Sequence, residues 1–174
     1  MTHRLATIDG MDSTTSAPIV LAAPDHPALD AARATFAAEL RSETRYFGQR
    51  GRSSRKASPT LVRRLVTPTP GVRLAAIVDG RIVGLARVDA AAADGPELLI
   101  AIVEAWRGRG LARTLTAAVL ERSHALGYHR LVLHSSHRSP ALRAIGQDLG
   151  FEAVDLGRGR LHLVFRWDAG ARSA

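Results

Sequence analysis

A buried strand that runs directly into a glycine-rich turn and an amphipathic helix constrains the fold of this chain more than any other feature. Residues 98–103 have the sequence Leu-Leu-Ile-Ala-Ile-Val, a nearly continuous apolar run that is typical of a strand covered on both faces. The turn that follows contains Gly108 and Gly110, and the amphipathic segment after it ends at Gly127. A strand of this kind needs helices on both faces of its sheet, so we expect an α/β domain.

The hydrophobic pattern around this segment predicts the rest of the sheet. Expected strands cover residues 18–23, 72–78, 81–89, 98–103, 130–134, 151–155 and 160–167. Asp79-Gly80, between the second and the third, is a strong hairpin signal. Expected helices begin at Asp25, at Ser42, at Ser58, in the glycine-rich turn and at Ser139. This order predicts an α/β (α+β) fold with a single mixed central sheet of about seven strands and helices on both faces.

Length and composition predict one domain. The chain has 174 residues, 46% hydrophobic and 23% charged, which excludes wholesale disorder, collagen-like repeats and coiled coils. No apolar run approaches the roughly 20 residues of a transmembrane helix, and the first residues lack the apolar core of a secretory signal. Because cysteine is absent, disulfides, thiolate metal sites and a cysteine nucleophile are excluded. We expect a cytoplasmic protein with a flexible leader over residues 1–17, one domain over residues 18–168 and a flexible tail over residues 169–174.

Basic side chains gather in one early stretch. The formal net charge is +8, and residues 41–64 contribute +7 of it, from eight cations and the single anion Glu43. Only one of the 24 basic residues, Lys56, is a lysine. Arginine holds phosphate and carboxylate groups bidentately, so the excess fits an anionic partner, and GC-rich codons explain it equally well. Residues 48–57 have little apolar content and are expected to form an exposed loop.

The glycine-rich turn has the chemistry of an anion site. Glycines let the backbone turn tightly and present successive N–H groups, and the helix that follows adds its positive dipole end, so a diphosphate can bind there. Arg107, Arg109 and Arg113 add positive charge. The turn lacks the third glycine of a dinucleotide fingerprint and the Gly-Lys-Ser/Thr of a P-loop. An ordinary strand-to-helix turn is therefore the alternative interpretation.

The pattern Arg107-x-x-Gly110-x-Ala112, between an apolar strand and a helix and followed by a strand, a helix and Leu149-Gly150-Phe151, resembles the GNAT superfamily of acyl-CoA-dependent N-acetyltransferases. The resemblance covers roughly residues 18–167. The element order derived above matches the fold of that family. The resemblance therefore implies that acetyl-CoA is the cosubstrate.

The resemblance also implies which residues bind the cofactor. Main-chain groups of the strand around Ile102 and Val103 would hold the pantetheine arm, with the thioester between two splayed parallel strands. The pyrophosphate would lie against the backbone amides and arginine side chains of the turn: Arg107, Gly108, Arg109, Gly110, Leu111, Ala112 and Arg113. Ser139 stands where many relatives have an asparagine that contacts the cofactor arm, and it is also a natural helix N-cap.

Residues 42–47, Ser-Glu-Thr-Arg-Tyr-Phe, are similar to a Ser-x-Glu-Ser-Arg-Tyr stretch of the Pat-type bacterial protein lysine acetyltransferases. The segment from Glu97 to the turn, with Trp106 just before it, also resembles theirs. The same short motif fits a wider set of small GNAT proteins, so both readings stay open.

Acetyl transfer needs a neutral amine and a stabilised leaving thiolate. Glu97 matches the catalytic glutamate of the Pat-type group and is the candidate general base; a solvated residue at the strand edge is the alternative. Many family members place a tyrosine acid five residues before the phenylalanine of the Gly-Phe pair. Here that position is Gly146, so the tyrosine is absent unless Tyr46 or Tyr128 replaces it.

His134 and His137 form a His-x-x-His pair after a strand. They could relay a proton, because histidine titrates near neutrality. Without a third identified ligand the pair is a weak metal site, so we expect no metal and ordinary polar residues at the end of a strand.

These observations predict an acetyl-CoA-dependent N-acetyltransferase in which a primary amine attacks the thioester directly. Protein lysine is the first candidate acceptor and a small-molecule amine the second. The alternative is an acyl-CoA-sensing or basic nucleic-acid- or protein-binding module with little catalytic activity. Residues 41–64 lack interleaved aromatic residues and a reading helix, which disfavours nucleic acid. No membrane partner is expected, and a homodimer is compatible with the sequence.

Overall fold

The computed structural model describes residues 6–8, 19–23, 27–42, 46–47, 53–54, 59–136, 140–158 and 160–167. Its main sheet has eight strands in the order β1-β2-β5-β6-β7-β8-β10-β9. Neighbouring strands are antiparallel except β7 and β8, which are parallel. The expected mixed sheet is confirmed. The strands are β1 (Ala6–Ile8), β2 (Ile19–Ala22), β5 (Arg73–Val78), β6 (Arg81–Asp89), β7 (Glu97–Ile102), β8 (Arg130–Ser136), β9 (Glu152–Asp155) and β10 (Arg160–Arg166).

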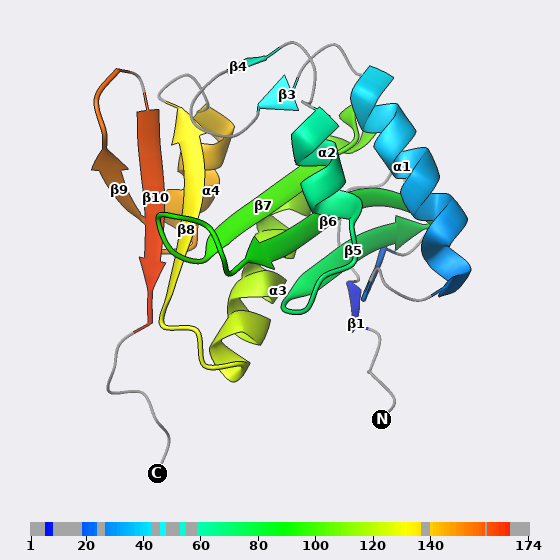
Figure 1. Ribbon diagram of the computed structural model, residues 1–174, viewed down its shortest axis with the longest axis horizontal. Helices are drawn as coiled ribbons and strands as arrows, with labels where there is room; N and C mark the ends of the chain where they lie inside the picture. The colour runs from blue at the N-terminus through cyan, green and yellow to red at the C-terminus, as the bar shows by residue number, and fades with distance from the viewer. Residues whose placement is uncertain are drawn as a thin grey trace.

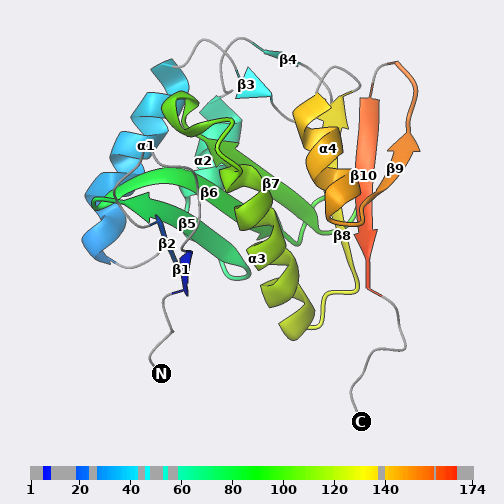
Figure 2. The same ribbon diagram turned by 180° about the vertical axis from the view of Figure 1, so that it is seen from behind.

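Helices cover both faces of this sheet, as the sequence predicts. Figure 1 shows α1 and α2 in front of the sheet, and Figure 2 shows α3 and α4 on the opposite face. The α-helices are α1 (Asp30–Ser42), α2 (Pro59–Val66), α3 (Leu111–Ala125) and α4 (Pro140–Asp148). Two short 3-10 turns accompany them, η1 (Pro27–Leu29) before α1 and η3 (Glu104–Trp106) between β7 and α3.

The hydrophobic core lies between the sheet and its helices, and β7 is at its centre. Leu98 of β7 and Leu115 of α3 are fully buried. Gly84 lets α3 approach β6 closely, because a Cβ at this position would lie 2.7 Å from Ile102 Cδ1 and 3.0 Å from Leu115 Cδ1. The expected doubly buried strand is confirmed, and its packing fixes where the turn before α3 emerges.

Local structure differs from expectation in the first third of the chain. β1 lies inside residues 1–17, where no strand was expected, and it pairs with β2; the boundaries of the domain stay a prediction. The helix expected to begin at Ser42 is wrong, because Ser42 ends α1 and residues 46–47 form β3 (Tyr46–Phe47). β3 pairs with β4 (Ser53–Ser54), which lies inside the segment expected to be a loop. Strands of two or three residues carry too little hydrophobic alternation to be recognised from sequence.

The rest of the chain folds as the pattern predicts. The hairpin at Asp79-Gly80 joins β5 to β6, and both residues have positive φ, 49° and 72°. Such a pair forms the two-residue turn that matches the twist of antiparallel strands. None of the helices in the described ranges is long and apolar enough to cross a membrane.

Candidate active site

The turn before α3 leads into the N-terminus of this helix through two glycines. Gly108 and Gly110 both have φ of 74°, a conformation that glycine adopts without strain. Gly110 is the N-cap of α3 and has no side chain to cap it, and the first helical hydrogen bond runs from Thr114 N to Gly110 O (3.1 Å). The N–H groups of the first turn of α3 therefore have no intrahelical acceptor and carry the positive end of the helix dipole.

A cavity of about 680 Å³ lies beside these N–H groups, between the start of α3 and the facing side of α4. Its lining is mostly apolar, from α4 and the end of β7, with the turn at one end. Seven of the predicted cofactor-binding residues line it: Ile102, Arg107, Gly108, Gly110, Leu111, Ala112 and Arg113. Val103 and Arg109 are not among the lining residues, and Ser139 lies outside the described residues.

The three arginines of the turn are each held by a local contact. Arg107 Nε donates to the main-chain oxygen of Ile102 (3.0 Å), which ties the turn to β7. Arg109 Cζ lies 4.8 Å from the ring centroid of Trp106, and the Arg113 guanidinium pairs with Asp148 of α4. Val103 N donates to Val83 O (3.0 Å), so this N–H is used inside the sheet. These contacts hold the three arginine side chains in place near the cavity.

The parallel strands β7 and β8 pair only where they begin. Their ladder has one position, Glu97 opposite Val132, and Val132 N donates to Pro96 O (2.8 Å). Beyond it the two strands diverge (Figures 1 and 2). The end of β7 that leaves β8 is the end that lines the cavity. The sheet therefore opens beside the cavity, and Glu97 lies at the closed end of this opening.

Glu97 is buried, with 5% of its surface exposed, and it belongs to a charged cluster on the α2 face. Arg64 of α2 donates through Nη2 to Glu97 Oε2 (2.9 Å) and through Nε to Asp89 Oδ2 (3.1 Å). Glu97 Oε1 lies 3.7 Å from His134 Nε2 of β8. The interpretation of Glu97 as a solvated strand-edge residue is wrong, because an arginine and a histidine surround its carboxylate.

Electrostatics within this cluster favour the charged forms. The hydrogen bond from Arg64 lowers the pKa of Asp89 below its usual range, against the effect of burial. Burial lowers the pKa of Arg64, but its hydrogen bonds to Asp89 and Glu97 outweigh this and leave that pKa raised. Two carboxylates share the Arg64 guanidinium, and the buried Arg87 adds a second positive charge near Asp89.

Two buried arginines fix the helix that supplies Arg64. Arg87 of β6 donates through Nη1 to the main-chain oxygens of Arg64 and, at 3.4 Å, of Thr67. Arg73 of β5 donates to Val66 O (3.5 Å). These three hydrogen bonds reach carbonyl groups at or just beyond the carboxyl end of α2, which the helix itself leaves without partners. They hold α2 against the sheet and so position the Arg64 side chain over Glu97.

The position at which the resemblance implies a tyrosine acid is closely packed. A Cβ at Gly146 of α4 would lie 2.8 Å from Leu163 Cδ1 of β10, so a larger residue there requires the Leu163 side chain to move. Tyr128 packs against the core with its hydroxyl beside Gly71, and for Tyr46 the structure describes the backbone alone. The departure at Gly146 therefore follows from the packing of α4 on β10.

Sequence reasoning missed several residues around Glu97. Arg64 was counted only as one cation of a basic stretch, and Asp89 only as the end of a strand. His162 and Asp94 also lie near His134, while His137 is outside the described residues. A signal existed for Arg64, because it lies one turn beyond the apolar Leu61 on a helix expected to pack on the sheet. Its partners are too distant in sequence for any spacing to show.

Comparisons with known proteins agree with this geometry. The model of the acetyltransferase (GNAT) family matches residues 34–151. The GNAT domain of S. lividans PAT has a TM-score of 0.70 at 21% identity, over 94% of this chain and 97% of that one. A GCN5-related N-acetyltransferase from Kribbella flavida gives 0.63 at 16%, over 86% and 98%. The protein yncA from Salmonella typhimurium, solved with its cofactor acetyl-CoA, gives 0.50 at 20%, over 57% and 66%. No curated protein sequence matches significantly.

Proposed function

Because the chain belongs to the acetyltransferase (GNAT) family, whose model matches residues 34–151, we propose that it moves an acetyl group from acetyl-CoA to a primary amine. The observation that carries this proposal is the cavity of about 680 Å³ bounded by the first turn of α3, by α4 and by the end of β7 that diverges from β8. An apolar cavity with an anion site at one end suits a long ligand in which an extended arm is attached to a diphosphate.

The turn binds the diphosphate of the cofactor in this proposal. The N–H groups from Arg109 to Ala112 point to the oxygens, and Arg107 and Arg113 contribute charge from positions already braced by protein contacts. Pre-organised donors lose little conformational entropy on binding. The pantetheine arm then lies along the apolar lining of β7 and α4, and the complex of yncA with acetyl-CoA supports such a cofactor for this fold.

Glu97 is the proposed general base. The cofactor cavity lies on the face of α3 and α4, whereas Glu97 lies on the face of α2, so the acetyl group reaches the acceptor between β7 and β8. The amine lone pair attacks the thioester carbonyl carbon, the carbon–sulfur bond breaks, and coenzyme A leaves as the thiolate. The proton lost by the amine passes to Glu97, directly or through water, and the thiolate takes its proton from solvent.

The proposed acceptor is a protein lysine, and a small-molecule amine is the second candidate. Residues 42–47 and the similarity in fold to S. lividans PAT support the first. In either case the Glu97 carboxylate, at the closed end of the opening between β7 and β8, is the group that receives the proton of the amine. The two candidate acceptors therefore share one proposed base.

Glu97→Gln tests the role of the base. The amide keeps an oxygen for Arg64 but cannot take a proton, so we expect kcat to fall about 100-fold while the Kd for acetyl-CoA stays unchanged. Release of the coenzyme A thiol is measured with lysine peptides and with small amines, and the Kd by calorimetry. Glu121→Gln, on the exposed side of α3, is the matched control.

Two results would contradict the proposal. Wild-type turnover by the Glu97→Gln protein across the pH range would remove Glu97 as the base. Tight binding of acetyl-CoA by the wild-type protein without thiol release for any amine would show a sensing module instead of an enzyme.

A further inference from the structure

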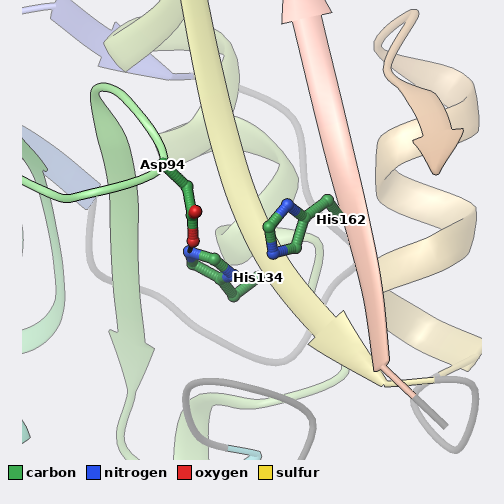
Figure 3. Close-up of side chains that lie close together, drawn as sticks. All are labelled: Asp94, His134 and His162. Carbon is green, nitrogen blue, oxygen red and sulfur yellow. Dashed lines mark ion pairs between the residues drawn. The ribbon is translucent and has the colours of Figure 1, made fainter. Parts of the chain in front are cut away.

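Two histidines and an aspartate converge beside Glu97. His134 of β8 and His162 of β10 are direct partners in the antiparallel ladder, so both side chains lie on the same face of the sheet. Their rings meet edge to face with centroids 4.2 Å apart. Asp94, in the loop between β6 and β7, brings Oδ2 to 3.8 Å from His134 Nε2. Figure 3 shows the three side chains turned toward one another from three separate segments.

The donor atoms of these side chains have the spacing of a metal site. One ligand atom from each residue lies within 4.8 Å of the other two. A tetrahedral zinc ion with ligands at about 2.0–2.2 Å needs donors about 3.4 Å apart, so small rotations of the side chains complete the geometry. Asp94 lies in a loop that can make this adjustment. The side chain of His134 is 8% exposed and that of Asp94 is 58% exposed. The site is therefore buried on the side of His134 and open to solvent on the side of Asp94.

We propose that Asp94, His134 and His162 bind one divalent transition-metal ion, Zn²⁺ in particular. Two imidazoles and one carboxylate form a set that zinc prefers and that magnesium, which selects oxygen ligands, does not. The sequence showed only His134 and His137, and no metal was expected because a third ligand was missing. The third ligand comes from the strand opposite His134, and strand pairing is what the sequence could not supply.

The ion would lie next to the proposed base, and this consequence rests on the proposed function. Glu97 Oε1 is 3.7 Å from His134 Nε2, the same atom that Asp94 approaches. A zinc ion held by His134 Nε2 lies beside the Glu97 carboxylate, pairs with its charge and so competes with the amine for it. Bound zinc therefore inhibits acetyl transfer without entering the cofactor cavity, which lies on the other face of the sheet.

The ion would also reinforce the weakest joint of the sheet. β7 and β8 share a single ladder position, and that position joins the strands β1 to β7 to the strands β8 to β10. Asp94 belongs to the first group and the two histidines to the second. Because zinc bridges the two groups only in the folded protein, its binding raises the temperature of unfolding.

Titration of the tag-free, metal-stripped protein with zinc chloride in a calorimeter tests the site. We expect one equivalent to bind, a higher Tm with zinc, and no response to magnesium chloride. His162→Gln removes a ligand and should weaken zinc binding at least tenfold and abolish the shift in Tm. His129→Gln, an exposed histidine outside the cluster, is the matched control and should bind zinc as the wild type does.

Equal zinc binding by the wild-type and His162→Gln proteins would overturn the site, and so would no binding to the wild type. A separate arm measures thiol release with zinc and after addition of a chelator. Reversible inhibition of the wild type and none of His162→Gln supports the link to Glu97; zinc binding without inhibition overturns that link. If the protein shows no transferase activity at all, the calorimetric arm still decides whether the metal site exists.

Discussion

The cofactor cavity and the cluster of Arg64, Asp89 and Glu97 lie on opposite faces of the same sheet and are built in opposite ways. The cavity is bounded by backbone N–H groups, glycines and apolar side chains, and its arginines are largely at the surface. The cluster is made of charged side chains, and Glu97 at its centre is buried. The cavity offers space and backbone dipoles that the fold holds in place. The cluster offers a buried carboxylate, whose charge is compensated by the neighbouring side chains.

In the proposed function, this difference separates cofactor binding from catalysis. Donors in the backbone are positioned by the fold itself, so a substitution disturbs the cavity only where it changes φ or fills space. A buried carboxylate depends on its partners, because an unpaired charge in a protein interior is costly. We therefore expect substitutions in the cluster to act on stability and rate, and substitutions in the turn to act on the affinity for the cofactor.

The largest effect on stability is expected for Arg64→Met. Methionine keeps the length and the helix propensity but leaves Glu97 buried without its guanidinium partner, and we expect a loss of about 3 kcal/mol in the free energy of unfolding. Urea denaturation measures it. Arg63→Met, on the exposed side of the same helix, is the matched control and should change the free energy by no more than about 0.5 kcal/mol. Equal losses in the two variants would show that Arg64 contributes as a surface residue only.

Gly110→Val disturbs the other face. A β-branched residue at φ of 74° is strained, and relief of this strain would displace the turn and the first N–H groups of α3. We expect the Kd for acetyl-CoA to rise at least about tenfold, which is about 1.4 kcal/mol. Gly127→Val carries similar strain at φ of 81°, at the far end of α3, and should leave the Kd unchanged. A wild-type Kd for Gly110→Val would remove the turn from the cofactor site.

The smallest effect is the pH dependence of the cluster. Because Arg64 lowers the pKa of Asp89 in the folded protein, the stabilisation from Asp89 is complete above its unfolded pKa of about 4 and is lost as the pH falls through the folded value. The difference in unfolding free energy between the wild type and Asp89→Asn should therefore shrink as the pH falls from 5 to about 2.5. Urea titrations at several pH values measure this difference. A constant difference would mean that Asp89 is not stabilised as an anion.

The sequence predicts the local structure that borders the cavity well, and the binding roles of its residues stay predictions. Gly108, Gly110 and the start of α3 are neighbours in the chain, so one short motif specifies the turn, the dipole and the arginines together. The hairpin at Asp79-Gly80 follows from two adjacent residues in the same way. Val103 and Arg109 do not line the cavity, and the N–H of Val103 is engaged inside the sheet by Val83, a hydrogen bond that depends on strand register.

The acceptor side is predicted only in part. Glu97 was found from the start of a strand, but its partners come from α2, β6 and β8, and which helix lies over which strand depends on tertiary packing. The sequence also could not show why a glycine stands at position 146. Leu163, whose side chain lies close to that position, belongs to the final strand. The net charge of residues 41–64 did not indicate the role of Arg64 either, since Arg64 is one of the eight cations in that stretch.

Hydrogen exchange of the wild-type protein, with and without acetyl-CoA, tests most directly whether the two faces divide the work. The cofactor should protect amides of residues 107–114 and of α4, and leave α2 and the end of β6 unchanged. Protection centred on α2, with none at residues 107–114, would contradict the assignment of the cavity to the cofactor and of the opposite face to the acceptor.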